Sequence, residues 1–128
     1  MILLLDTATP TCRICLIDES QRVESEWIAD RQLAKGLLSY IHEQLNQQGK
    51  SWTDLTGLGV NRGPGSFTGL RIGITVLNTL ADSLQIPIIG ANGENWKNQA
   101  IDSLQNGEND RIVLPLYDRE ANITSPRK

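Results

Sequence analysis

The alternation of hydrophobic and polar positions divides the chain into short strand-like runs. Six runs have the length and composition of strands, at positions 2–5, 12–17, 22–28, 56–60, 86–90 and 111–117. The run 2–5 is uniformly apolar, which is typical of a buried central strand. The run 22–28 alternates, so we predict a strand near the edge of the sheet that is antiparallel to 12–17.

Apolar residues recur at helical spacing in two long segments, 32–48 and 66–85. Gly49 suits the position that follows the C-cap of the first helix. Ser66 suits the N-cap of the second helix, because its hydroxyl can accept a hydrogen bond from a free backbone N–H. Two shorter helical segments are expected at 51–55 and 94–104. This order of elements predicts an α/β domain whose mixed sheet has an antiparallel hairpin at one edge.

The long second helix has two non-polar stripes that lie side by side. One stripe is Leu70, Ile74, Leu77, Ala81 and Leu84, and the other is Gly65, Gly69, Gly73, Val76 and Leu80. Together they cover more surface than one sheet would occupy, so we expect the helix to pack on a sheet and on a second helix. Each glycine within a helix costs about 1 kcal/mol relative to alanine, which indicates that something approaches the bare backbone. We predict a neighbouring helix, from another chain, rather than a ligand.

Composition and charge narrow the classes of function. The 128 residues suffice for one domain, and 15 acidic residues against 12 basic ones give a net charge of −3. This balance argues against a free-standing protein that binds nucleic acid or an acidic membrane. No apolar run approaches the roughly 20 residues of a membrane span. The first run ends at Asp6 and has no basic segment before it, so we expect a cytoplasmic protein without membrane contact.

The two cysteines, Cys12 and Cys15, form a C-x-x-C pattern inside a strand-like run. Residues three apart in a strand point to opposite faces, so these thiols would not meet. We interpret both as structural residues. His42 is the only histidine, and no group of residues has the spacing of metal ligands. No metal site, cofactor or catalytic residue is therefore expected.

Nucleotide chemistry is an alternative that the residues leave open. The dinucleotide fingerprint G-x-G-x-x-G needs its third glycine two residues after Gly59, but the next glycine, Gly63, comes after three. The P-loop pattern needs a glycine five residues before Gly49, where this chain has Gln44. Asp6 follows a buried strand, where its carboxylate could orient a phosphate or a metal-bound water, or could cap a turn. A nucleotide-dependent phosphotransferase or hydrolase would use a loop made of Asp6, Thr7, Thr9, Gly63, Gly65 and Ser66.

Two motifs together carry a resemblance to a known family. The first is Leu3-Leu4-Leu5-Asp6-Thr7-Ala8-Thr9, which is followed by Cys12. The second is the run 59–73, Gly-Val-Asn-Arg-Gly-Pro-Gly-Ser-Phe-Thr-Gly-Leu-Arg-Ile-Gly. With Ile-Pro-Ile-Ile-Gly at 86–90, their order and spacing resemble the TsaB (YeaZ) family over residues 2–90, and more weakly over 113–119.

The resemblance implies an actin-like lobe of the ASKHA, ribonuclease H-like type. The lobe would occupy residues 1–117 and would contain a mixed sheet of five to six strands flanked by helices. Members of this family usually have two lobes and are much longer, so the second lobe would be mostly missing. Residues 118–128 would be a polar tail or a remnant of that second lobe.

The resemblance also implies a role in making threonylcarbamoyladenosine at position 37 of tRNA. A TsaB protein is a non-catalytic scaffold that dimerises with TsaD and activates it; TsaE joins the complex, and tRNA is contacted only through the complex. Alone, such a protein forms a homodimer. The interface residues implied here are Leu33, Leu37, Tyr40, Ile41, Gly65, Phe67, Gly69, Ile72, Gly73, Val76 and Leu80. A one-lobe homodimer without a role in tRNA modification is a further alternative.

Overall fold

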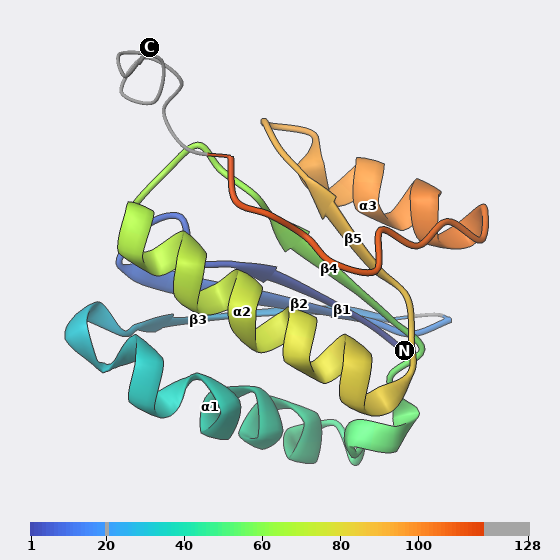
Figure 1. Cartoon of the computed structure of the whole chain (residues 1–128). Coiled ribbons are helices and arrows are strands. Elements are labelled where there is room, and N and C mark those ends of the chain that lie inside the picture. Colours follow the sequence, from blue (N-terminus) through green and yellow to red (C-terminus); the bar gives the residue numbers. More distant parts are fainter. Residues whose placement is uncertain (20, 117–128) are drawn as a thin grey trace, which may run out of the picture.

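The centre of the fold is a mixed sheet with the strand order β3-β2-β1-β4-β5. A computed structural model describes residues 1–19 and 21–116 (Figure 1). The strands are β1 (Ile2–Asp6), β2 (Thr11–Ile17), β3 (Arg22–Ile28), β4 (Gly57–Asn61) and β5 (Ile88–Ala91). The helices are α1 (Leu33–Gln47), α2 (Phe67–Leu84) and α3 (Trp96–Gln105), with single 3₁₀ turns at Asp30–Gln32 and Trp52–Asp54. The predicted tail 118–128 lies outside the described residues.

The uniformly apolar β1 is the central strand, as predicted. It is antiparallel to β2 and parallel to β4. Leu3 and Leu5 face the layer formed by α1 and α2, whereas Leu4 faces α3 on the other side of the sheet. The alternating β3 is an edge strand antiparallel to β2, which confirms the predicted hairpin. Both faces of β1 are buried, which explains why its pattern does not alternate.

The two long helices bury the stripes that their spacing predicts. In α1 the buried positions are Leu33, Leu37, Ile41 and Leu45, and in α2 they include Leu70, Ile74, Leu77 and Ala81. As predicted, α2 packs on both the sheet and a second helix, and this second helix is α1 of the same chain. Gly49 follows the C-cap of α1 with a φ of 70°, a conformation that glycine adopts without strain. No helix in the described part of the chain is long and apolar enough to span a membrane.

Residues 111–116 do not form the strand that their apolar pattern predicts. Asn78 of α2 bonds to both backbone groups of Val113: its amide donates to the carbonyl at 3.0 Å and its oxygen accepts from the N–H at 2.9 Å. Val113 is only 3% exposed, so this side chain replaces the partner strand that the buried backbone would otherwise need. Tyr117, the last residue of the predicted strand, lies outside the described residues.

The segment 109–116, here called the strap, runs beside β5 and satisfies its outer edge (Figure 1). Asn109 Oδ1 accepts from the N–H of Ile88 at 3.1 Å, and Asp110 Oδ2 accepts from the N–H of Gly90 at 2.8 Å. The N–H of Asp110 donates to the carbonyl of Ile88 at 2.8 Å. Side chains of the strap thus occupy edge positions that a sixth strand would otherwise use.

The two cysteines lie on opposite faces of β2, as predicted. Both are buried and free, with Cys12 in the layer of α1 and α2 and Cys15 in the layer of α3. Burial, followed by the nearby negative charge of Asp6, raises the pKa of the Cys12 thiol to about 12. Burial also raises the pKa of Cys15. Both groups are therefore neutral packing residues at neutral pH.

The raised pKa of Cys12 predicts a loss of stability in alkali. Above the unfolded-state pKa of 9.0, the unfolded thiol loses its proton while the folded thiol keeps it up to about 12. The free energy of unfolding should therefore fall as pH rises through this window, by up to about 1.4 kcal/mol per pH unit. Urea titrations between these pH values should show a shallower fall in Cys12→Ala. Ile14→Val removes buried volume but no titrating group, so its unfolding free energy should fall with pH as steeply as that of the unmodified protein. If the unmodified protein, Cys12→Ala and Ile14→Val all show the same fall, Cys12 is not the group responsible.

Candidate functional site

The loop after β1 meets the first turn of α2 at one end of the sheet (Figure 1). Thr7 is fully buried, and its hydroxyl donates to the carbonyl of Gly69 at 2.6 Å. The N–H of Ser66 donates to the carbonyl of Ala8 at 2.8 Å. Ser66 is the N-cap of α2, as predicted, because its hydroxyl accepts from the N–H of Gly69 at 3.2 Å. The loop and the start of the helix therefore form one hydrogen-bonded unit.

Asp6 and Asn61 lie at the carboxyl ends of two neighbouring parallel strands, β1 and β4. Asp6 Oδ1 accepts from the N–H of Ala8 at 2.9 Å and from the side-chain amide of Asn61 at 3.1 Å. Asn61 Oδ1 accepts from the N–H of Gly63 at 3.0 Å. The carboxylate thus orients the turn that leads into α2. Asn61 is absent from the predicted site, although its position after a strand parallel to β1 is a signal that could have identified it.

The six residues of the predicted nucleotide loop come together at this end of the sheet. Several of their polar groups already bond within the chain. The N–H groups of Ser66 and Gly69, which could hold a phosphate at a helix start, both donate to oxygens of the protein. The hydroxyl of Thr9 donates to the carbonyl of Thr11 at 3.2 Å. These bonds support a structural role for the loop, and nucleotide binding stays a prediction.

The glycine stripe of α2 faces its own chain, which corrects the expectation of a helix from another chain. A Cβ at Gly65 would lie 2.6 Å from the Cβ of Ala8. A Cβ at Gly69 would collide with the backbone carbonyl of Thr7, and one at Gly73 would collide with the Thr7 hydroxyl. The bare backbone therefore accommodates the loop after β1. A direct contact between these glycines and a partner stays a prediction.

The other predicted interface side chains differ in their exposure. Leu33, Leu37 and Ile41 are buried against the sheet, because they belong to the core-facing stripe of α1, and they leave almost no surface for a partner. Tyr40 is half-buried, and its hydroxyl donates to Ser25 Oγ at 2.9 Å. The remaining four, with half-buried or exposed side chains on α2, are Phe67, Ile72, Val76 and Leu80.

An apolar face remains exposed where α1 and α2 lie side by side. Leu38, which the predicted interface omits, is 50% exposed on this face. Phe67 is 54% exposed, but it precedes Val76 by about 2.5 helical turns and therefore projects from the opposite side of α2. Ala34 precedes Leu38 by one helical turn and lines a hollow of about 340 Å³ together with Ile72 and Val76. We call the surface defined by Ala34, Leu38, Ile72 and Val76 the α1–α2 face.

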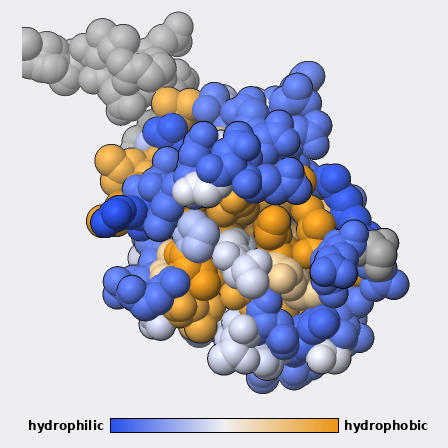
Figure 2. Space-filling view, turned by 90° about the vertical axis from the view of Figure 1, so that its right-hand side faces the viewer, coloured by the Kyte–Doolittle hydropathy of each residue, from blue (hydrophilic) through white to orange (hydrophobic). Residues whose placement is uncertain are grey.

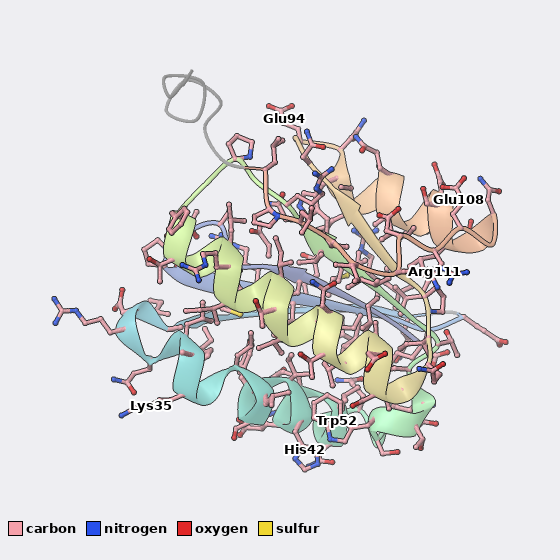
Figure 3. The ribbon with its side chains drawn as sticks, in the orientation of Figure 1. Lys35, His42, Trp52, Glu94, Glu108 and Arg111 are labelled. Atoms are coloured by element: carbon pink, nitrogen blue, oxygen red, sulfur yellow. The ribbon has the colours of Figure 1, made fainter. Side chains whose placement is uncertain are left out.

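His42 and Trp52 lie close together at the outer surface near α1 (Figure 3). Their rings stack with centroids 5.7 Å apart and an angle of 9° between the planes. This contact supports the interpretation of His42 as a surface packing residue. Within residues 1–19 and 21–116, no three His, Cys, Asp or Glu side chains are placed to hold a metal ion.

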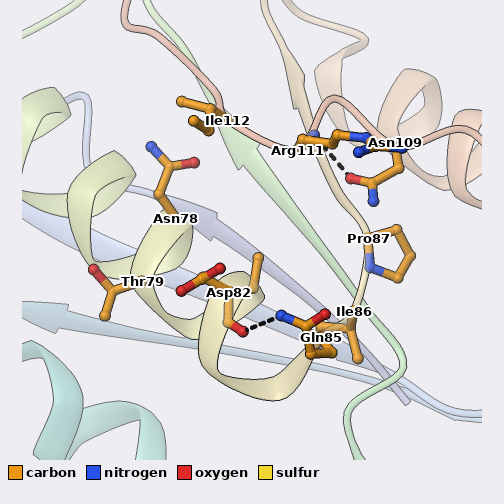
Figure 4. A pocket seen from close by; sticks show the side chains of 10 residues that line it. Asn78, Thr79, Asp82, Gln85, Ile86, Pro87, Asn109, Arg111 and Ile112 are labelled. Atoms are coloured by element: carbon orange, nitrogen blue, oxygen red, sulfur yellow. Dashed lines mark hydrogen bonds between the residues drawn. The ribbon is translucent and has the colours of Figure 1, made fainter.

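A separate hollow of about 670 Å³ lies beside the end of α2 (Figure 4). Polar side chains around it support local turns: Gln85 Nε2 donates to the carbonyl of Asp82 at 2.7 Å, and Asn109 Oδ1 accepts from the N–H of Arg111 at 2.8 Å. Figure 2 views the molecule from the end at which α2 and α3 finish, and hydrophobic side chains gather there within a hydrophilic rim. The Asp6 loop and the start of α2 lie at the opposite end of the molecule.

Comparison with known proteins determines the family. The family profile described as "TsaD: tRNA N6-adenosine threonylcarbamoyltransferase" matches residues 26–104, which is more than half of the chain. The "tRNA threonylcarbamoyladenosine biosynthesis protein TsaB" of Escherichia coli K12 is 37% identical over 89 residues, which cover 70% of this chain. The protein of the same name from Bacillus subtilis strain 168 is 35% identical over 124 residues, or 91% of this chain. The chain belongs to the TsaB family.

A solved TsaB-type structure shares the fold. "YeaZ from Pseudomonas aeruginosa" superposes with a TM-score of 0.69 at 30% sequence identity, and the match covers 83% of this chain and 49% of that one. This likeness confirms the predicted actin-like lobe with its mixed sheet and flanking helices. The matches span 38% of the E. coli TsaB and 49% of the B. subtilis TsaB, so the chain corresponds to less than half of these relatives.

Proposed function

We propose that the chain acts in the synthesis of threonylcarbamoyladenosine in tRNA, as a non-catalytic subunit that pairs with TsaD and activates it. The observation that carries this proposal is the exposed apolar α1–α2 face. Leu38 is half exposed there, one helical turn from Ala34, which lines the hollow together with Ile72 and Val76. Contiguous apolar surface of this kind is typical of a site for a protein partner. The names of the TsaB relatives supply the pathway.

TsaD is the proposed partner because the family profile that bears its name covers the same helices. Residues 26–104 include both α1 and α2, so a TsaD protein is expected to present a corresponding pair. Two similar helix pairs can pack face to face around an approximate two-fold axis. A stable interface buries about 1,600 Å² in total. TsaE and tRNA are proposed as members of the same complex, without an assigned surface on this chain.

The proposal predicts that a charge on the α1–α2 face prevents the complex. Val76→Asp and Leu38→Asp each place a carboxylate where the partner would bury apolar surface, so we expect affinity for TsaD to fall at least about tenfold. Co-purification with TsaD of the same organism measures the complex. Threonylcarbamoyladenosine in the tRNA of cells that lack their own TsaB measures the function.

Ile101→Asp is the matched control, because Ile101 is a half-buried apolar residue of α3 on the opposite face of the sheet. It should lower stability to a similar degree and leave TsaD binding intact. Folded Val76→Asp protein that still binds TsaD and restores tRNA modification would overturn the proposal. A different result would favour the one-lobe homodimer over the proposed function. In that case Val76→Asp would dissociate a homodimer, and cells would modify their tRNA equally well with and without the chain.

The second candidate is a nucleotide-dependent phosphotransferase or hydrolase. The observation that favours it is the convergence of Asp6 with the turn 63–66 at the carboxyl ends of β1 and β4. Against it, Asp6 Oδ1 and two backbone N–H groups at the start of α2 already have partners in the chain. Calorimetry with ATP and magnesium tests it. Heat of binding that disappears in Asp6→Asn would favour this candidate over the scaffold.

A further inference from the structure

Two hollows lie along the first half of α2. The hollow of about 340 Å³ lies on the α1–α2 face, and another of about 690 Å³ extends to the end of β3. They share Thr68 and Ile72, and exposed Ile28 lines the second hollow. We call the two neighbouring hollows together the α1–α2 groove. From Thr68 to Val76 the helix rises about 12 Å, which matches two turns of a partner helix.

The lining of the groove carries more positive than negative charge, in a chain whose net charge is −3. Among the described residues, Arg71 is the only charged one in the lining of the hollow on the α1–α2 face. Asp30 and Arg31 are the charged residues in the lining of the other hollow. Arg71 lies over the ring of Phe67, with its Cζ 5.3 Å from the ring centroid. None of the ion pairs among the described residues involves Arg71 or Arg31.

We infer that this groove selects a hetero-partner, whose helical surface carries a carboxylate beside apolar residues, over a second copy of the same chain. Arg71 is the residue that sets this specificity. A guanidinium held at the edge of an apolar surface is suited to a bidentate pair with a partner carboxylate. The inference rests on the proposed function and adds the chemistry that the partner must present.

Self-association through this groove is disfavoured by the same charges. In an isologous dimer each protomer presents the same patch, so two grooves with an excess of positive charge would face each other. Like charges across an interface oppose association, whereas complementary charges fix the choice of partner. Apolar burial contributes to either complex, whereas the charge of Arg71 distinguishes between them.

The test follows TsaD binding and self-association in the same proteins. We expect Arg71→Gln to weaken TsaD binding about tenfold in titration calorimetry and to leave self-association unchanged or stronger in analytical ultracentrifugation. Raising salt from about 0.05 M to about 0.5 M should likewise weaken TsaD binding and leave self-association unchanged or stronger. Arg71→Lys, which keeps the charge, should retain most of the affinity for TsaD. Lys97→Gln, which removes one positive charge from α3, should change neither equilibrium.

The outcomes separate the inference from the function on which it rests. If Val76→Asp breaks the TsaD complex but Arg71→Gln and salt do not weaken it, the inference fails and the proposed function stands. Weaker self-association in Arg71→Gln would also overturn the inference, since it would show that the arginine favours the homodimer. If the unmodified chain does not bind TsaD at all, both fail.

Discussion

Replacing Gly73 by alanine is expected to destabilise the protein by about 3 kcal/mol, the upper end of the usual cost of overpacking. The added Cβ would collide with the hydroxyl of Thr7, and it would also lie 3.0 Å from Cγ2 of Thr7. Thr7 is fully buried and bonded to Gly69, so it cannot turn away freely. Urea titration of the variant measures the loss.

A double-mutant comparison makes this expectation specific. Thr7→Ala removes the side-chain atoms that would meet a Cβ at position 73, so Gly73→Ala should cost less in the Thr7→Ala background. Gly69→Ala should show no such rescue, because its Cβ would meet the backbone carbonyl of Thr7. Ser83→Ala, on an exposed turn of α2, is the control and should change stability by less than about 0.5 kcal/mol. Equal costs in both backgrounds would contradict the packing that the structure describes.

Asn78→Leu is expected to cost about 2–3 kcal/mol, although leucine has a similar size and favours helices. The substitution removes both hydrogen bonds to Val113 and leaves a buried backbone N–H and carbonyl without these partners. Hydrogen exchange at Val113 should accelerate more than exchange in β1, because the strap would open before the sheet unfolds.

The control for this variant lies one residue further along α2. The hydroxyl of Thr79 is exposed and donates to the carbonyl of Thr75 at 2.9 Å, so Thr79→Ala also loses a side-chain hydrogen bond but leaves no buried group unpaired. It should change stability by about 0.5 kcal/mol or less. Unchanged exchange at Val113 in Asn78→Leu would show that the strap is held by other contacts.

Hydrophobic spacing was sufficient to predict the sheet and the helices because burial follows it closely. The uniform run of β1 and the alternation of β3 correspond to a strand buried on both faces and a strand at the edge. The apolar residues Ile112, Val113 and Leu114 lead the sequence pattern to predict a strand at 111–117. The backbone groups of Val113 bond instead to the side chain of Asn78, and a bond between residues 35 positions apart leaves no periodic signal.

For the candidate site, too, sequence spacing does not reveal contacts between residues that are distant along the chain. Spacing along α2 predicts that something approaches Gly69 and Gly73, but spacing cannot tell whether the neighbour belongs to the same chain. The neighbour is Thr7, 62 residues away from Gly69 along the chain. Likewise, the spacing of α1 identifies Leu37 as apolar and helical, and only the fold shows that it is buried while Leu38 is exposed.

The strap has a consequence for the behaviour of the protein at high concentration. A strand at the end of a sheet presents unpaired N–H and carbonyl groups that can template another strand, which leads to edge-to-edge aggregation. In β5 the N–H groups of Ile88 and Gly90 are already taken by the side chains of Asn109 and Asp110. A foreign strand would have to displace these bonds before it could pair, so the strap makes this edge of the sheet a poor seed for fibres or amorphous aggregates.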